Sequence, residues 1–465
     1  MNLSAFKAYD VRGRIPDEIN ESLARDIGRA YAGFVGAKRV VVGRDIRLSS
    51  NALAEALIEG LLSSGIDVSD IGLGGTENVY FTTAAGDAAG PFDGGIMVTA
   101  SHNPPDYNGM KFVREGSRPI SADTGLREMA SMILEGRLPA SAETRGAPSG
   151  RRTGFDSRAA YRDHLLGYID RKTLRPLKVV VNAGNGGAGS IVDLLEPHLP
   201  FEFIKVHHEA DGTFPNGVPN PMLERNRVAT IEAIRRSGAD LGLAWDGDFD
   251  RCFFFDGAGR FIEGYYLVGL LAESFLRRES GARIVHDPRL TWNTLDIVQR
   301  LGGVPVLSKS GHAFIKQKMR EVDGAYGGEM SAHHYFRNFA YCDSGMIPWL
   351  LVLERISSSG KSLAELVDER IRLFPCSGEI NRRVPDGKAA IAAVQARYSP
   401  GATSIDFTDG LSIEFPDWRL NLRSSNTEPL IRLNVESRGS EPLMQEKTGE
   451  ILGFLGELGA VAADH

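Results

Sequence analysis

Three aspartates stand at alternate positions along the chain, at Asp246, Asp248 and Asp250. Carboxylate oxygens that converge at the end of a strand suit a hard cation such as Mg²⁺. A calcium-binding EF-hand is excluded, because its sixth and twelfth positions need Gly and Glu, where this chain has Arg251 and Gly257. A solvated acidic turn is the remaining alternative. The aromatic run that follows is typical of a buried strand, and carboxylates beside such a strand are costly without a cation, which favours the metal site.

A serine stands next to a histidine at Ser101 and His102, directly after an apolar strand expected over 95–98. The pair suggests an activated hydroxyl, but adjacent residues of a strand point to opposite faces, so no Ser-His-Asp triad follows from it. A turn formed by Asn103 and the next proline is the alternative. Lys111 follows shortly afterwards, and lysine is a cation that burial can convert into a general base.

Several residues could bind phosphate and sugar groups. Arginines recur near the predicted strand ends, at Arg12, Arg44, Arg47, Arg251, Arg289 and Arg423. Each alone reads as a surface charge, but together they suggest anion sites, because a planar guanidinium matches phosphate oxygens. The loop 423–427 adds hydroxyl and amide groups that can cradle phosphate. The loop from Glu329 to His333 offers a carboxylate, a hydroxyl and an imidazole, which suit sugar hydroxyls; a satisfied structural network is the alternative there.

A glycine-rich loop over 184–189 fits the dinucleotide fingerprint, with Glu209 about 20 residues further on. Nothing downstream supplies a hydride-transfer site. We therefore favour a glycine turn that packs a helix close to a sheet.

The elements that must position these residues alternate between apolar strands and helices, which is typical of βαβ units. Three such units are expected, with first strands at 40–42, 178–182 and 283–287 and second strands at 95–98, 241–245 and 324–326. Ligands gather at the carboxyl ends of such strands. Residues 419–423 and 430–435 alternate instead, as antiparallel strands do. The fold expected is α/β, with three related mixed-sheet domains (1–148, 149–258, 259–369) and a C-terminal α+β domain (370–465) around a central cleft.

Composition excludes several classes of protein. The net charge of −7 over 465 residues argues against a protein that covers nucleic acid. The three cysteines are far apart and fit neither a disulfide framework nor a zinc site, which indicates a reducing cytoplasm. The N-terminus lacks an apolar segment of signal-peptide length, and the apolar run 347–353 is too short to span a bilayer. We expect a cytoplasmic protein that uses neither membrane nor nucleic acid.

A cation site, a loop serine, a sugar-like polar loop and a phosphate loop therefore lie on four successive domains. Phosphoryl transfer to or from a sugar phosphate is the reaction that would use all four.

With these motifs in this order, the chain resembles the α-D-phosphohexomutase family over essentially its whole length, from residues 7–13 to the phosphate loop. It is most similar to the bacterial phosphomannomutases and the bifunctional phosphomannomutase/phosphoglucomutases. The resemblance implies an isomerase in which Ser101 is carried as phosphoserine and shares Mg²⁺ with the three aspartates. The phosphoserine would give its phosphoryl group to a hexose phosphate. The resulting 1,6-bisphosphate would turn over and return its other phosphate, exchanging the 1- and 6-phosphates.

The same resemblance implies roles for the remaining site residues. Arg12, His102 and Arg251 would position the phosphoserine or stabilise charge in the transition state. Lys111 and His312 would handle protons and charge near the transfer. The substrate-binding residues that it implies, with Arg251, are Tyr9, Arg289, Gly311, Glu329, Ser331, His333, Arg423, Ser425, Asn426 and Thr427. Mg²⁺ and a hexose 1,6-bisphosphate activator are the implied cofactors, a sugar phosphate is the partner, and no obligate protein partner is evident.

Within the family, the sugar loop at Glu329 resembles that of mannose and glucose enzymes. Activity on mannose phosphates is expected first and activity on glucose phosphates second. Phosphoglucosamine mutase and a metal-dependent sugar phosphatase are alternatives. A non-catalytic sugar-phosphate-binding protein is a third, for which Ser101 and the aspartates would have no purpose.

Overall fold

The computed structural model describes residues 4–144, 146, 148–424 and 430–463. They form two compact units. The first comprises the described residues up to Arg260 together with Asn338–Ser358, and the second comprises Phe261–Arg337 and the described residues from Ser359 onward. Among the described helices, none combines the length and the apolar character needed to cross a membrane.

The first unit begins with a mixed sheet ordered β1-β5-β4-β2-β3-β7, with β6 paired to β5. Its strands are β1 (Val11–Arg14), β2 (Arg39–Arg44), β3 (Asp67–Leu73), β4 (Gly94–Val98), β5 (Tyr107–Arg114), β6 (Arg118–Pro119) and β7 (Arg152–Gly154). β2, β3, β4 and β7 are parallel, while β5 is antiparallel to β1 and β4. β7 joins this sheet although it lies beyond the domain boundary expected at residue 148.

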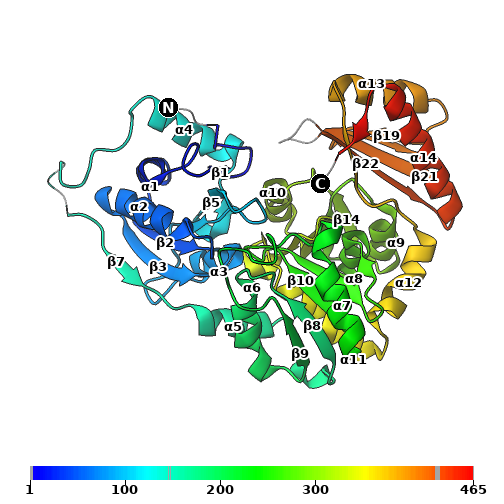
Figure 1. Ribbon diagram of the computed structural model, residues 1–465, viewed down its shortest axis with the longest axis horizontal. Helices are drawn as coiled ribbons and strands as arrows, with labels where there is room; N and C mark the ends of the chain where they lie inside the picture. Colours follow the sequence, from blue (N-terminus) through cyan, green and yellow to red (C-terminus); the bar gives the residue numbers. More distant parts are fainter. Residues whose placement is uncertain (1–3, 145, 147, 425–429, 464–465) are drawn as a thin grey trace. The chain divides into compact units, whose positions relative to one another are not determined.

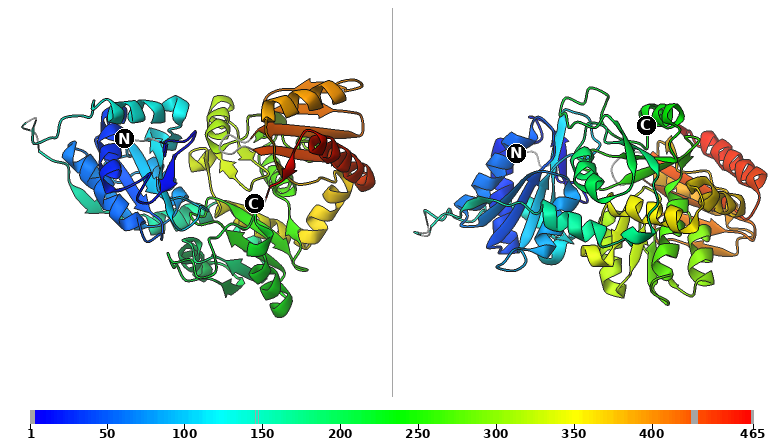
Figure 2. Two further views of the ribbon diagram at one scale, coloured as in Figure 1. Left: turned by 45° about the horizontal axis from the view of Figure 1, so that its top comes forward. Right: turned by 90° about the horizontal axis from the view of Figure 1, so that it is seen from below.

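Helices cover this sheet (Figures 1 and 2). They are α1 (Glu21–Val35), α2 (Ser50–Ser63), α3 (Thr76–Ala85) and α4 (Leu126–Leu134). Apolar side chains of α1, α2 and α4 share one core cluster with β2 and β4, while α3 contacts β2 and β4. α1 begins where Asn20 accepts a hydrogen bond from Leu23 N and ends at Gly36, whose φ of 66° suits glycine.

The first unit also contains a second mixed sheet, in which β11-β10-β8-β9 are neighbours. Its strands are β8 (Lys178–Asn182), β9 (Glu202–Val206), β10 (Leu241–Trp245) and β11 (Cys252–Asp256). The accompanying elements are α5 (Arg158–Leu166), α6 (Ala188–Leu195), α7 (Val228–Ser237), β17 (Cys342–Asp343) and α11 (Ile347–Ser359). Trp349 of α11 stacks edge-on against Trp245, with ring centroids 6.5 Å apart. α11 thus packs on this sheet, although the sequence placed it in the third segment.

The second unit contains a third mixed sheet, in which β14-β13-β15-β16 are neighbours. Its strands within this unit are β13 (Arg283–His286), β14 (Val304–Leu307), β15 (Tyr326–Gly328) and β16 (His334–Phe336). The same part of the second unit also contains β12 (Phe261–Ile262), α8 (Gly264–Leu276), α9 (Trp292–Arg300), α10 (His312–Val322) and α12 (Leu363–Leu373). The strand expected at 324–326 begins two residues later, at Tyr326.

The C-terminal sheet is antiparallel, in the order β19-β20-β21-β22-β18-β23. Its elements are β18 (Ile380–Arg383), α13 (Gly387–Tyr398), β19 (Ser404–Asp406), β20 (Leu411–Glu414), β21 (Trp418–Ser424), β22 (Leu430–Ser437), α14 (Glu441–Glu457) and β23 (Val461–Ala462). α13 and α14 share its apolar core. Three mixed α/β sheets and one antiparallel α+β sheet confirm the predicted fold class, while the domain boundaries stay predictions.

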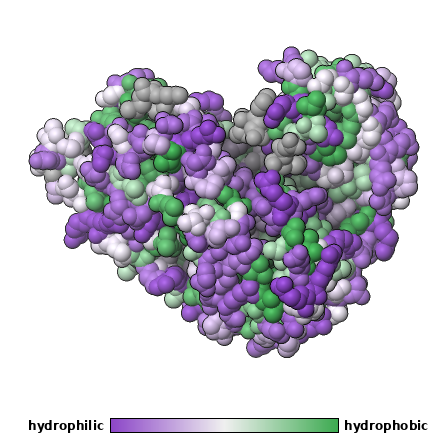
Figure 3. Space-filling view, viewed as in Figure 1, coloured by the Kyte–Doolittle hydropathy of each residue, from purple (hydrophilic) through white to green (hydrophobic). Residues whose placement is uncertain are grey.

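Short 3-10 helices connect these elements, at Glu115–Ser117, Ala122–Thr124, Arg171–Thr173, Glu196–His198, Glu224–Asn226 and Arg337–Phe339. On the face drawn in Figure 3, hydrophobic residues form small patches surrounded by hydrophilic ones. Scattered apolar residues of this kind are normal on a water-exposed surface.

Candidate active site

The loop serine lies in a turn just past β4. Ser101 is buried, with 3% of its surface exposed, and its φ of 50° lies in the left-handed region. Its Oγ is 3.0 Å from His102 Nδ1 and donates to Asp246 Oδ2, also at 3.0 Å. The expectation that Ser101 and His102 point to opposite faces is therefore wrong, because the positive φ places Ser101 in a turn and not on a strand.

The three aspartates lie in the tight turn that joins β10 to β11. Asp246 and Asp248 are fully buried and Asp250 nearly so, and one oxygen of each lies within 4.8 Å of the others. A solvated acidic turn is excluded by this burial. Asp248 Oδ1 is buried without a hydrogen-bond partner among the described residues. An orphaned carboxylate oxygen inside a cluster of carboxylates fits the coordination of a divalent cation.

Glycine lets the serine loop and the aspartate loop approach each other. A Cβ on Gly247 would lie 2.4 Å from Ser101 O, closer than real Cβ contacts allow. Gly75 is restricted in the same way, since its Cβ would lie 2.5 Å from Asp248 O. Close backbone contact of the aspartate loop with the serine loop thus requires glycine at position 247, and its contact with the start of α3 requires glycine at position 75.

Two threonines that the sequence analysis missed hold these loops. Thr76, in the first turn of α3, donates its hydroxyl to Asp248 Oδ2, and its main-chain N donates to Asp248 O at 3.2 Å. Thr99 Oγ1 accepts from Ser101 N at 2.9 Å. The two glycines before Thr76 were the available signal, because they indicate a place where the backbone passes close to another segment as a helix begins. Nothing in the sequence marked Thr99.

Lys111 sits between two of the aspartates. Its Nζ donates to Asp248 Oδ2 at 2.7 Å and to Asp250 Oδ2 at 2.6 Å. Burial lowers the pKa of Lys111, but the two carboxylates outweigh burial and raise that pKa above its ordinary value. The ammonium group keeps its proton here, which does not fit the general-base role suggested for this lysine.

Two arginines surround His102. Arg251 donates through Nη2 to Asp246 Oδ2 at 2.7 Å and to His102 Nδ1 at 2.5 Å. Burial, together with the charges of Arg251 and Arg12, lowers the pKa of His102 well below its ordinary value, so its imidazole is neutral. Arg12 donates to Asn103 Oδ1 at 2.7 Å and reaches the serine loop from β1.

A second cluster of predicted residues lies in the second unit, around Glu329. This buried carboxylate accepts from Gly311 N at 2.8 Å and from Tyr335 Oη at 2.5 Å. Arg289 Nη2 lies 3.4 Å from Glu329 Oε1 and 3.3 Å from Ser331 Oγ. The loops before α10 and after β15 therefore meet the Arg289 loop after β13, at the carboxyl ends of parallel strands.

Glu379, which the sequence analysis missed, gathers three arginines in the second unit. Arg289 and Arg423 lie 3.3 and 3.1 Å from its Oε2, and Arg432 lies 3.1 Å from its Oε1. Burial would raise the pKa of Glu379, but the three guanidinium groups outweigh burial and lower that pKa to about 2. A lone glutamate before β18 gave no signal in the sequence. Glu379 brings together three positively charged side chains, as expected near a phosphate-binding site.

The remaining predicted residues are placed as follows. His312 begins α10, and its ring centroid lies 6.4 Å from that of His333. Tyr9 lies in the bend before β1. Ser425, Asn426 and Thr427 lie outside the described residues.

The glycine loop 184–189 leads into α6, as the preferred interpretation requires. A Cβ on Gly189 would lie 2.2 Å from His208 O, so glycine is needed for this helix to pack closely.

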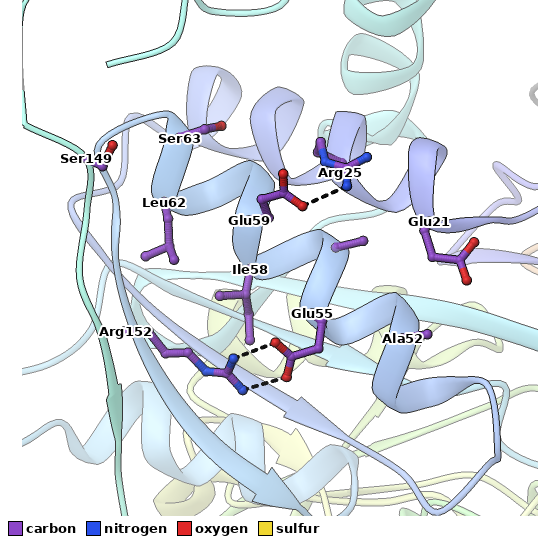
Figure 4. Close-up of a pocket in the computed structure, with 11 residues that line it drawn as sticks. Glu21, Arg25, Ala52, Glu55, Ile58, Glu59, Leu62, Ser63, Ser149 and Arg152 are labelled. Carbon is purple, nitrogen blue, oxygen red and sulfur yellow. Dashed lines mark hydrogen bonds and ion pairs between the residues drawn. The ribbon is translucent and has the colours of Figure 1, made fainter. Parts of the chain in front are cut away.

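An open cavity of about 600 Å³ lies apart from the residues predicted for the site, between α1, α2 and the strand β7 (Figure 4). Both arginines of its lining pair with glutamates of the same lining. Arg152 donates to both oxygens of Glu55, at 2.6 and 2.8 Å, and Arg25 donates to Glu59 at 2.7 Å. Arginines already paired in this way offer little to an anionic ligand.

Comparison with protein families covers most of the chain. Residues 3–135, 159–259 and 263–374 match alpha/beta/alpha domains I, II and III of phosphoglucomutase/phosphomannomutase, and residues 379–451 match the C-terminal domain. The four matches follow one another along the chain in the order expected for one enzyme of this kind.

Full-length relatives are similar in sequence. A protein named phosphohexose mutases from Xanthomonas campestris pv. campestris (strain B100) is 61% identical over 98% of this chain and 100% of its own length. A phosphomannomutase from Salmonella montevideo is 58% identical over 98% and 99% of the two chains. The crystal structure of a phosphoglucomutase/phosphomannomutase family protein from Burkholderia thailandensis superposes with a TM-score of 0.88, at 33% identity and 99% coverage of both chains.

Proposed function

The chain belongs to the phosphoglucomutase/phosphomannomutase family, and from this membership we propose that it interconverts hexose 1-phosphates and hexose 6-phosphates, with mannose and glucose as the sugars. One observation carries the proposal for this chain's own residues. Ser101 Oγ donates to Asp246 Oδ2 at 3.0 Å, inside a buried cluster of three aspartates. A hydroxyl held against a cation site is the arrangement that reversible phosphorylation of serine requires.

We propose that Ser101 is carried as phosphoserine, and that its phosphate and the three aspartates hold Mg²⁺. The cation, when bound, would neutralise the negative charge that a phosphate brings among three carboxylates. The orphaned Oδ1 of Asp248 supports this donor set. Lys111 already pairs with Asp248 and Asp250, so it would share in balancing the charge of the cluster.

The transfer itself would exchange one phosphorus–oxygen bond for another. The bond from phosphorus to Ser101 Oγ breaks as a bond forms to the free hydroxyl of the hexose phosphate, and that hydroxyl loses its proton. Arg12 and Arg251 would stabilise charge on the transferring group. His102, whose imidazole is neutral, and His312 would move protons near it. The same transfer then runs in reverse from the other end of the 1,6-bisphosphate, so that its other phosphoryl group passes to Ser101. A hexose 1,6-bisphosphate added in trace would therefore prime the enzyme.

We propose that the second unit binds the sugar phosphate. Glu329, Ser331 and His333 would hold the sugar hydroxyls. The remaining phosphate would be held by Arg289 and Arg423, together with Ser425, Asn426 and Thr427, which lie outside the described residues, while Tyr9 and Gly311 would contact the substrate at its edges. The arginines held ready by Glu379 support the phosphate assignment. We place the enzyme in the cytoplasm, which its three free cysteines support.

A mutase assay tests the proposal. Mannose 1-phosphate and glucose 1-phosphate are each supplied with Mg²⁺ and a trace of the matching 1,6-bisphosphate, and formation of the 6-phosphates is followed. Conversion of both sugars is expected. Release of inorganic phosphate without 6-phosphate would indicate a phosphatase. Tight binding of hexose phosphates without turnover would indicate a binding protein, and either result would overturn the proposal.

A further inference from the structure

Arg47 lies behind the serine loop, three residues after the end of β2, and is 3% exposed. Its guanidinium donates to four main-chain carbonyls of one turn. Nη2 reaches Ser101 O at 2.9 Å and Asn103 O at 2.6 Å, and Nη1 reaches Pro104 O at 2.7 Å and Tyr107 O at 3.0 Å. These carbonyls span the connection from β4 to β5, so one side chain fixes the course of the backbone around the nucleophile.

The guanidinium is itself held in place by its own strand end. Asp45, which is 3% exposed, lies with Oδ2 3.4 Å from Arg47 Nε, and its Oδ1 accepts from Arg47 N at 3.0 Å. Ser50 donates to the same Asp45 oxygen at 2.5 Å, and Asn108 donates to Ser50 at 2.9 Å. These bonds fix the position of the Arg47 guanidinium, so it can hold the serine loop in place.

A loop of the second sheet's domain covers the open face of Arg47. The ring centroid of Phe214 lies 5.2 Å from Arg47 Cζ, within the range of a cation–π contact. A Cβ on Gly212 would lie 2.1 Å from Ile46 O, so this loop contacts the Arg47 turn without room for a side chain at that point. The domain that supplies the aspartates thus also packs on the residue that shapes the serine loop.

We propose that Arg47 is a positioning residue for phosphoryl transfer, an inference that rests on the proposed function. It holds the backbone at 101–107 so that Ser101 keeps its φ of 50° and directs Oγ toward Asp246. A serine rarely adopts this conformation unless its surroundings impose it. Only a planar guanidinium offers two nitrogens that each donate to two acceptors, so lysine cannot replace it. Arg47 does not contact the transferred group in this assignment.

Kinetics of three variants test this role. Arg47→Ala and Arg47→Lys should lower kcat by about 30-fold or more, because a misplaced nucleophile loses a large part of its rate. The KM for the hexose phosphate should change by less than about threefold, since the sugar phosphate is bound by other residues. Methylguanidinium should restore part of the rate of Arg47→Ala, and methylammonium should not. Arg39→Ala is the matched control on the same strand; its guanidinium donates to Asp87, and kcat should hardly change.

Hydrogen exchange gives a readout that does not depend on turnover. Asn103 N donates to Ala100 O and Tyr107 N donates to Pro104 O, each at 3.0 Å. In Arg47→Ala and Arg47→Lys both amides should exchange about tenfold faster than in the wild-type full chain, because the turn has lost its common donor. If the Arg47 variants fail to fold, Phe214→Leu is the milder alternative, because it removes the aromatic ring that packs against the Arg47 guanidinium.

The outcomes separate the two proposals. Unchanged exchange together with an unchanged kcat would overturn the role of Arg47. A raised KM with normal kcat, or a lost rate that methylguanidinium fails to restore, would also overturn it and leave Arg47 as a stabilising residue only. If the wild-type protein converts no hexose phosphate, the proposed function fails, and the exchange of the two amides still decides whether Arg47 holds the loop.

Discussion

Thr76 donates its hydroxyl to Asp248, a residue 172 positions further along the chain. The contact joins the first turn of α3 in the first sheet's domain to the aspartate loop of the second. It engages Oδ2 of Asp248, while Oδ1 of the same carboxylate is buried without a hydrogen-bond partner among the described residues.

Replacing Thr76 by valine should weaken Mg²⁺ binding about fivefold, because one hydrogen bond to a carboxylate contributes about 1 kcal/mol to its placement. The Mg²⁺ concentration that gives half-maximal turnover is the measurement. Thr83→Val on the same helix is the control, since Thr83 is equally buried and its hydroxyl lacks a hydrogen-bond partner in the described part of the chain. Equal Mg²⁺ dependence of the two variants would contradict the role of Thr76.

Ser101→Ala should lose turnover by a factor of roughly 10³ or more, because in the proposed mechanism Ser101 is the group that accepts the phosphoryl group. The affinity for glucose 1-phosphate, measured by calorimetry in the presence of Mg²⁺, should stay within about threefold of wild type. Ser131→Ala serves as the control, since its hydroxyl donates to Glu135 at the exposed C-terminal end of α4. Near-normal turnover of Ser101→Ala would remove this serine from its role.

Arg423→Ala should raise the KM for hexose phosphates by roughly 10- to 100-fold, the loss expected for a charge-assisted hydrogen bond to phosphate. The kcat should fall much less, because in the proposed mechanism this arginine holds the phosphate that is not transferred. Steady-state kinetics separate the two effects. Arg397→Ala is the control in the same domain, where that guanidinium covers the ring of Phe454. An unchanged KM in Arg423→Ala would sink the phosphate assignment.

Glu77 should make the stability of the first unit depend on pH. It is fully buried in α3, accepts from Tyr161 Oη, and burial raises its pKa from 4.5 to about 8. Between these pH values the folded protein binds a proton that the unfolded chain has lost. The contribution of Glu77 is therefore fully present below about pH 4.5 and is lost as pH rises through 8, by on the order of 1.4 kcal/mol per pH unit.

Thermal unfolding followed from pH 5 to pH 9 measures this effect. The Tm of the wild-type protein should fall relative to that of Glu77→Gln as pH rises, because glutamine keeps a neutral group at this position. Glu59→Gln on exposed α2 should show a constant difference from wild type over the same range. A constant difference for Glu77→Gln as well would mean that the carboxyl group is not held neutral.

The positions of some candidate site residues in the fold could be predicted from local sequence alone. The aspartates and Ser101 each follow an apolar run that had to become a buried strand, so a place at a strand end was inferable from pattern alone. The antiparallel pairing of β21 with β22 was likewise predictable from the alternation of polar and apolar residues along both strands.

Other features depend on contacts that no local pattern records. The contact between Ser101 and His102 depends on a positive φ at Ser101. A serine does not signal this conformation in a sequence as a glycine or asparagine would. Glu379 became significant only when three arginines, one from the loop after β13 and one each from β21 and β22, converged on it. Arg47 was recognised as an arginine at a strand end, yet its four carbonyl partners belong to a loop more than fifty residues away.

The missing methyl group at Gly247 has a consequence for protein engineering. Because a side chain at Gly247 would collide with Ser101 O, the serine loop and the aspartate loop must keep complementary shapes where they touch. A chimaera that joins the first sheet's domain of one relative to the second sheet's domain of another would have to match this contact to within a few tenths of an ångström. Recombination between relatives should therefore succeed more often with a crossover near residue 260 than with one near residue 150.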